Sequence, residues 1–272
     1  MDIKFERYTF GKRLKSMLKV DFRRMFGTKL FYIILGISFV VPILILVMTT
    51  MMDGSVSVNP QTGEETIMEA FDSAWQIIGT VSGETASTDT AAMSMDMMSM
   101  CNINLLYFGI AALVCIFTAE DFRSGYAKNL FTVRARKTDY VISKTLVCTV
   151  GGMLLILSFF IGTMLGGAIA GLPFEMVGFD VGNVVICLLS KMFLIAVFVP
   201  IYLLMSVIAK QKLWLSLLLS LMTGMFLFMM IPMLSPLNAT IMNVILCIAG
   251  GVMLSTGLGA ISNQVLKKTS LV

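Results

Sequence analysis

The sequence predicts an all-α integral membrane protein with six transmembrane helices, and three observations lead to this fold class. The chain has 272 residues, of which 57% are hydrophobic, and its mean hydropathy is +0.90. Soluble domains are about 45–50% apolar. Several apolar runs reach the ~20 residues that a helix needs to cross a bilayer. The basic residues, finally, are confined almost entirely to alternate segments between these runs.

Six apolar runs define the predicted spans. They are Leu30 to Met52, Ile103 to Ala119, Val141 to Ala170, Val181 to Ala209, Leu213 to Pro232, and Ala239 to Ser262. Residues 1–29 form a charged N-terminal segment, and residues 30–272 form the six-helix transmembrane domain. Because the first apolar run follows such a strongly charged segment, it does not resemble a cleaved signal peptide.

The distribution of charge predicts the orientation of the chain. Nine Lys and Arg residues precede the first span, six lie in the loop over residues 120–144, two follow the fourth span, and two lie near the C-terminus. The loops over residues 53–102 and 171–180 contain no Lys or Arg but hold ten Asp and Glu. Basic loops stay in the cytoplasm. We therefore expect a multi-pass protein of the cell membrane with both termini inside, an extracellular loop at 51–102 and a cytoplasmic loop at 120–144.

The stretch from Gly11 to Lys29 predicts an amphipathic helix before the first span. Its apolar residues recur at steps of three and four, and most of its other residues are Lys or Arg. The apolar residues are Leu14, Met17, Leu18, Phe22, Met25 and Phe26. Such a helix lies in the membrane interface. It is either a general basic anchor or an elbow helix that packs against the cytoplasmic loop.

The long outer loop predicts one short amphipathic helix, because its larger apolar residues follow helical spacing. They are Ile67, Met68, Phe71, Trp75 and Ile78. A methionine cluster follows, at positions 93, 95, 97, 98 and 100. Thioethers bind Cu(I), but methionine also fills gaps in apolar packing throughout this chain. We favour packing and expect no metal site.

Two further features of the spans leave alternatives open. Lys191 lies well inside the fourth apolar run, so it either has a function, lining a substrate path or pairing with an acid, or it snorkels or is paired structurally. Small residues at GxxxG spacing allow close helix contacts, either within one subunit or between two. They are Gly162 and Gly166, Gly167 and Gly171, and Gly251, Ser255 and Gly259.

Several kinds of chemistry lack the residues they need. The chain has no histidine and no GxxxxGK[ST] phosphate loop. Histidine-dependent hydrolysis, histidine-ligated metals and ATP hydrolysis by this chain are therefore not expected, so the protein is not an enzyme by itself. Four of its five cysteines lie inside apolar runs, where a thiol behaves as a small hydrophobic group. The basic residues are explained by orientation and docking, not by nucleic-acid binding.

The loop between the second and third spans carries the most specific pattern. It reads as an acid, an aromatic residue, Gly, Lys-Asn, Arg, Tyr and Ser-Lys. These positions are Glu120, Phe122, Gly125, Lys128, Asn129, Arg136, Tyr140, Ser143 and Lys144. The pattern resembles the first cytoplasmic loop of ABC-2-type transporter permeases, although the Pro or Gly that is common before the Arg is missing. The interfacial helix and the six spans match this family too, and the long outer loop resembles bacteriocin- or lantibiotic-immunity and multidrug-type exporters.

The resemblance implies a mechanism and its partners. Two permease subunits would pair as a homodimer or heterodimer among membrane lipids, and each would dock a separate ATPase subunit that binds ATP and Mg²⁺. A coupling helix in the 120–144 loop would sit in a groove of the ATPase. Arg123, Lys128, Arg134 and Arg136 would supply charged contacts, and Phe122, Tyr126 and Phe131 would fill apolar pockets. Glu120 would cap that helix or pair with a basic residue.

The expected function is therefore export of a substrate, such as an antimicrobial peptide or another amphipathic compound, by an ABC transporter. Two other classes remain open. One is a stand-alone membrane immunity or scaffold protein. The other is a secondary transporter or channel, which usually needs intramembrane acids or broken helices for ion coupling.

Overall fold

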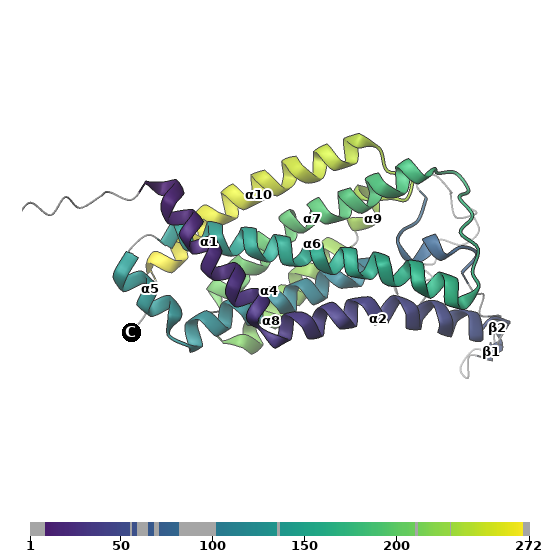
Figure 1. The fold of residues 1–272 in the computed structure, drawn as a ribbon, viewed down its shortest axis with the longest axis horizontal. Helices are drawn as coiled ribbons and strands as arrows, with labels where there is room; N and C mark the ends of the chain where they lie inside the picture. Colours follow the sequence, from purple (N-terminus) through teal and green to yellow (C-terminus); the bar gives the residue numbers. More distant parts are fainter. Residues whose placement is uncertain are drawn as a thin grey trace, which may run out of the picture.

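A computed structural model describes residues 9–54, 56–58, 65–67, 71–81, 102–134, 137–209, 212–228 and 230–268, and it is a bundle of long helices (Figure 1). Five of the helical segments are long and apolar enough to cross a membrane. They contain α2 (Lys29–Met51), α4 (Leu106–Arg123), α6 (Lys137–Ala170), α7 (Val181–Ile208) and α10 (Ile241–Lys268). The predicted all-α membrane protein is confirmed.

The predicted span from Leu213 to Pro232 is interrupted in the structure. It forms α8 (Leu213–Phe228), which has 16 residues, and the single turn α9 (Ile231–Leu234). At 1.5 Å per residue α8 is about 24 Å long, shorter than the ~30 Å apolar core of a bilayer. Pro232 has no N–H for the carbonyl of Phe228, four residues before it, and its ring would clash there. The proline fits instead in the first turn of α9.

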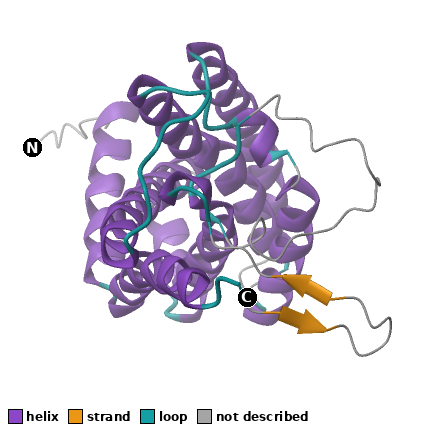
Figure 2. Ribbon diagram, turned by 90° about the vertical axis from the view of Figure 1, so that its right-hand side faces the viewer, coloured by secondary structure: helices purple, strands orange, loops and turns teal. Residues whose placement is uncertain are grey.

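The two ends of the bundle carry different additions (Figures 1 and 2). One end, called here the basic end, holds α1 (Phe10–Gly27) and α5 (Tyr126–Arg134). The other, the acidic end, holds an antiparallel hairpin of β1 (Val56–Val58) and β2 (Glu65–Ile67). Helix α1 begins and α10 ends at the basic end (Figure 1), so the chain makes an even number of passes along the bundle. Together α8 and α9 make the pass between α7 and α10.

The helix predicted in the outer loop is wrong. Ile67 ends strand β2, and among the described residues 71–81 the helical part is one 3-10 turn, η1 (Ala74–Ile77). Tertiary contacts fix this turn, because the Trp75 indole donates to the carbonyl of Phe174 over 3.2 Å. Met68 and the methionine cluster lie outside the described residues. A second 3-10 turn, η2 (Ile103–Leu105), leads into α4.

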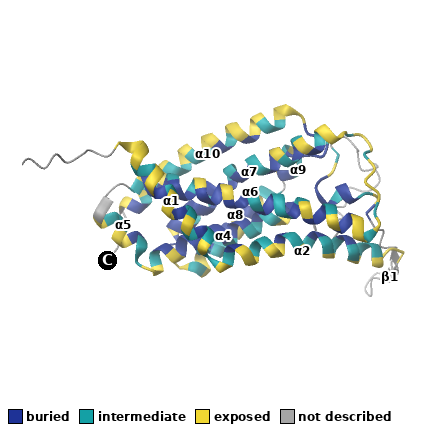
Figure 3. Ribbon diagram, viewed as in Figure 1, coloured by how far each residue is buried: buried dark blue, intermediate teal, exposed yellow. Residues whose placement is uncertain are grey.

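Burial divides each helix into an inner and an outer face (Figure 3). Large apolar side chains such as Ile33 and Ile37 on α2, and Val252 and Met253 on α10, are exposed. An apolar surface of this extent is typical of helices that contact lipid or another subunit. Residues that face inward from α4, α6 and α7 form the core.

The small-residue seams are used inside the subunit. A Cβ atom at Gly162 would collide with the backbone oxygen of Phe39, and one at Gly166 would lie 2.8 Å from the Ile43 Cα. Both contacts join α6 to α2. On α10, a Cβ at Gly251 would lie 2.9 Å from the Cβ of Ala196 on α7. Glycine at these positions therefore allows the backbones of neighbouring helices in one chain to approach each other.

Replacing Gly162 by alanine should destabilise the protein by about 1–3 kcal/mol, because the added methyl group forces α2 and α6 apart. Gly257→Ala is the matched control, since a Cβ at Gly257 on α10 meets nothing within 4 Å. Thermal unfolding of the purified proteins in detergent measures the stability of both variants. A Gly162 variant as stable as the Gly257 variant would contradict the close contact.

Candidate functional site

At the basic end, the segment from 120 to 144 forms the end of α4, helix α5 and the start of α6. Helix α4 extends to Arg123, beyond the predicted end of the second span, and α6 begins at Lys137, before the predicted start of the third. Gly125 separates α4 from α5 with a φ of +72°, a left-handed conformation that glycine adopts without strain. The predicted short helix is present as α5, which has nine residues.

A buried ion-pair cluster joins three helices beside α5. The ammonium of Lys144 on α6 lies 3.1 Å from Asp21 Oδ1 on α1 and 2.7 Å from Asp121 Oδ2 on α4. All three side chains are fully buried. The two contacts are close ion pairs but lack hydrogen-bond alignment. The Lys144 ammonium also lies 3.6 Å from the centre of the Phe117 ring, a cation–π distance.

Hydrogen bonds complete the cluster around both carboxylates. Ser143 donates to Asp21 Oδ2 over 2.6 Å, and Tyr140 donates to Asp121 Oδ2 over 2.9 Å. The guanidinium of Arg24 on α1 donates to Asp121 Oδ1 over 2.5 Å. Two carboxylates and two cations therefore share the cluster, so its formal charge is zero. This compensation is what buried charges require.

The charges around Arg24 favour its protonated, positively charged form. Partial burial acts to lower the pKa of Arg24, but the nearby charge and hydrogen bond of Asp121 outweigh it and raise the pKa above its usual value. Burial raises the pKa of Tyr126, and the negative charges of Asp21 and Asp121 raise it further. Tyr126 is therefore a neutral phenol at physiological pH, with the Arg24 guanidinium 3.9 Å from its ring centre.

Further contacts fasten the surrounding elements. Arg13 on α1 pairs with Asp139 on α6 over 3.1 Å. The ring of Tyr140 packs edge-on against Phe131 of α5, with centroids 5.4 Å apart, and against Phe122 of α4 at 6.3 Å. Helix α1 thus packs on α6 and on the cluster, and its role as an interfacial elbow helix stays a prediction.

The structure separates the predicted site residues into two groups. The aromatic residues Phe122, Tyr126 and Phe131 are partly buried, and Tyr140 and Lys144 are wholly buried. Their contacts are with this chain's own helices. The exposed members are Glu120, Arg123, Lys128 and Asn129. Arg136 and the side chain of Arg134 lie outside the described residues.

Asp21 and Asp121 were missed by the sequence interpretation, although the sequence held a signal for Asp21. It is the only acid in the basic stretch from Gly11 to Lys29. It also falls on the apolar stripe, four residues after Met17 and four before Met25, and these three are the buried residues of α1. An acid on the buried face of a basic helix indicates a buried cation as its partner.

Lys191 is held by neutral groups near the acidic end. Its ammonium donates to Asn104 Oδ1 and to Ser235 Oγ, both over 3.1 Å, and its side chain is fully buried. The hydroxyl of Tyr107 donates to the Lys191 backbone carbonyl over 2.8 Å. Of the alternatives for Lys191, structural pairing fits this geometry, and its partners are neutral groups and not an acid. A role in a substrate path stays a prediction.

A metal site is not supported by the part of the chain that the structure describes, where no three His, Cys, Asp or Glu side chains gather. Cys115, Cys148, Cys187 and Cys247 are free and buried. Cys101 lies outside the described residues.

Comparison with known proteins identifies one family. A family model described as "ABC-2 family transporter protein" matches residues 18–229, which include α2 to α8 and most of α1. No curated protein and no solved structure matched the chain.

Replacing Lys144 by methionine should destabilise the protein by about 3–5 kcal/mol, because it leaves two buried carboxylates without their shared cation. The control is Lys128→Met, which removes an equal charge from an exposed position on α5. Chemical unfolding in mixed micelles measures the difference in stability between the two variants. If both variants unfold alike, the carboxylates are not held by Lys144.

The hydrogen bonds of Lys191 are tested by comparing the loss of folding stability in two variants. Asn104→Ala should lower the free energy of unfolding by about 1–3 kcal/mol, because the buried amine of Lys191 loses an acceptor. Lys191→Met should cost less, since it removes the amine itself and Ser235 keeps its bond to the Ile231 carbonyl. The double variant should be no less stable than Asn104→Ala alone. The reverse order, measured by thermal unfolding, would show that the Lys191 charge itself stabilises the fold.

Proposed function

Because the chain belongs to the ABC-2 family of transporter proteins, we propose that it is the membrane-spanning permease subunit of an ABC transporter. A separate ATPase subunit would bind ATP and Mg²⁺ and dock at the basic end. The observation that carries this proposal is the buried cluster of Lys144, Asp21 and Asp121, which ties α1, α4 and α6 together next to α5. A force applied to α5 would reach all three helices at once.

The docking surface would be the exposed side of α5 and the turn before it. Arg123, Lys128 and Asn129 are exposed there, and the aromatic side chains of α5 face the bundle. The partner would therefore meet charged and polar groups at the surface, and the apolar contacts would transmit its movement inward. Arg136, which follows α5, is proposed as a further contact on the strength of the sequence pattern.

The orientation proposed for the chain follows its charges. Lys and Arg residues gather at the basic end, and the segments at the acidic end carry ten Asp and Glu but no Lys or Arg. By the positive-inside rule the basic end, with α5 and both termini, faces the cytoplasm of the cell membrane. An ATPase subunit in the cytoplasm would then have direct access to α5.

A second permease subunit, identical or different, would complete the transporter. Exposed apolar faces on α2, α8 and α10 offer surface both for this subunit and for lipid. We propose that the complex exports an amphipathic compound such as an antimicrobial peptide. The acidic outer segments would attract cationic substrates.

The test is co-purification of the ATPase subunit with the tagged chain from its native membranes. Reversing two exposed charges, Arg123→Glu with Lys128→Glu, should weaken this association roughly tenfold, because attraction becomes repulsion at an exposed surface. The matched control, Lys212→Glu with Lys267→Glu, makes the same charge change at two exposed positions outside α5 and the turn before it.

Mass spectrometry and ATPase activity of the purified material give the readout. An ATPase that is retained by the control and lost with the α5 variant would establish the docking surface. A chain that purifies alone under gentle conditions, without nucleotide dependence, would instead favour a stand-alone immunity or scaffold protein, or a secondary transporter.

A further inference from the structure

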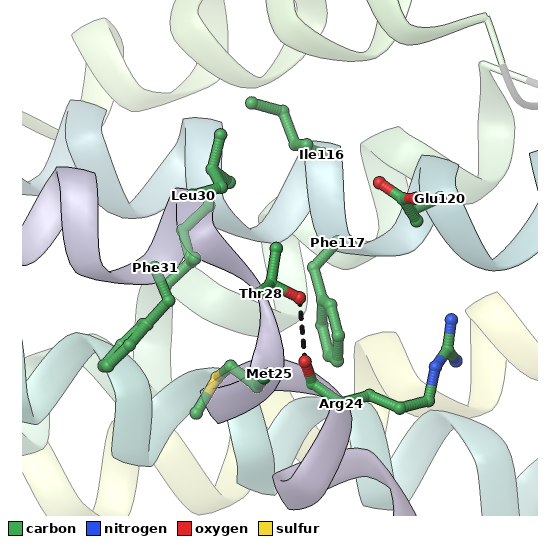
Figure 4. A pocket seen from close by; sticks show the side chains of 10 residues that line it. Arg24, Met25, Thr28, Leu30, Phe31, Ile116, Phe117 and Glu120 are labelled. Carbon is green, nitrogen blue, oxygen red and sulfur yellow. Dashed lines mark hydrogen bonds between the residues drawn. The ribbon is translucent and has the colours of Figure 1, made fainter.

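A cavity of about 290 Å³ lies where α1 turns into α2, opposite α4 (Figure 4). Most of its wall is apolar and includes Leu30, Phe31, Ile116 and Phe117. Helix α1 is amphipathic and basic, whereas α2 is apolar and long enough to span a bilayer. The junction between them therefore lies at the level where lipid headgroups meet acyl chains.

Two groups of opposite charge line the same cavity. The carboxylate of Glu120 and the guanidinium of Arg24 lie on one side of it in Figure 4. Arg24 contacts Asp121 through NH1 and keeps 26% of its side chain exposed. Glu120 is exposed and belongs to none of the ion pairs found among the described residues. Because the neighbouring cluster is neutral by itself, Glu120 contributes an uncompensated negative charge at the cavity.

A mostly apolar hollow at this depth is a place for a lipid, because the apolar part of its wall offers water no hydrogen bonds and its few polar groups can hold a headgroup. The polar groups restrict which headgroup fits. A phosphate would accept hydrogen bonds from a guanidinium edge. A primary ammonium would donate to the free carboxylate, which a purely anionic headgroup would avoid.

We propose that this cavity binds a zwitterionic aminophospholipid from the membrane. The phosphate contacts Arg24, the ammonium contacts Glu120, and one acyl chain packs against Leu30, Phe31 and Ile116. The bound lipid would fill the space between the α1–α2 junction and α4, close to the ion-pair cluster. The cavity lining does not include Arg123, Lys128 or Asn129, the exposed residues of the proposed ATPase contact, and the site needs no partner subunit.

The experiment is native mass spectrometry of the full chain, released from nanodiscs of equal parts phosphatidylethanolamine, phosphatidylcholine and phosphatidylglycerol. Phosphatidylethanolamine should be retained roughly two- to fivefold over each of the others, the range expected for one exposed charge pair. Glu120→Gln should abolish this preference. Glu175→Gln, which changes an exposed glutamate at the acidic end, should leave it intact.

A second variant tests the apolar wall. Ile116→Trp places a larger side chain in the cavity and should lower retention of all three lipids, while thermal unfolding checks that the variant is folded. Equal retention of the three lipids by the unaltered chain would overturn the proposal. So would a preference for phosphatidylglycerol, which would indicate attraction by the basic residues alone. Retention unchanged by Glu120→Gln would likewise exclude the ammonium contact.

Discussion

Lys144 carries a positive charge into a part of the protein that water does not reach. Taking such a charge out of water costs several kcal/mol unless opposite charges compensate it. Here the compensation comes from Asp21 and Asp121, which lie on two different helices, and their carboxylate oxygens also accept from Ser143, Tyr140 and Arg24. Each partner is buried because the others are, so the positions of α1, α4 and α6 at this end are set together.

This mutual dependence also explains the arrangement of α5. The short helix is held by the contact of Phe131 with Tyr140 and by the contact of Tyr126 with Arg24. Both of these partners bond directly to Asp121. A partner that binds the exposed side of α5 therefore acts on a helix that is one contact away from the cluster.

Much of the fold could be predicted from the sequence because length and hydropathy determine what crosses a bilayer. Helices α2 and α7 agree with their predicted spans to within one residue at each end. Hydropathy could not show that α6 begins at Lys137, because its first turns are polar yet packed. Nor could periodicity reveal that the apolar residues of the 120–144 segment face inward, since a repeating pattern defines a face and not its partner. The ion pairs of Lys144 with Asp21 and Asp121 could not be predicted either, because they depend on distances between helices that the sequence does not give.

Helix α6 runs without interruption for 34 residues, about 51 Å at 1.5 Å per residue. Near its first turns Lys144 fixes it to the cluster, and near its last turns Gly162 and Gly166 press it against α2. The helix is thus held by contacts near both of its ends. A tilt of about 5° would displace its far end by roughly 4 Å over that length. A small change in the angle of α6 at the basic end would therefore move its other end by several ångströms.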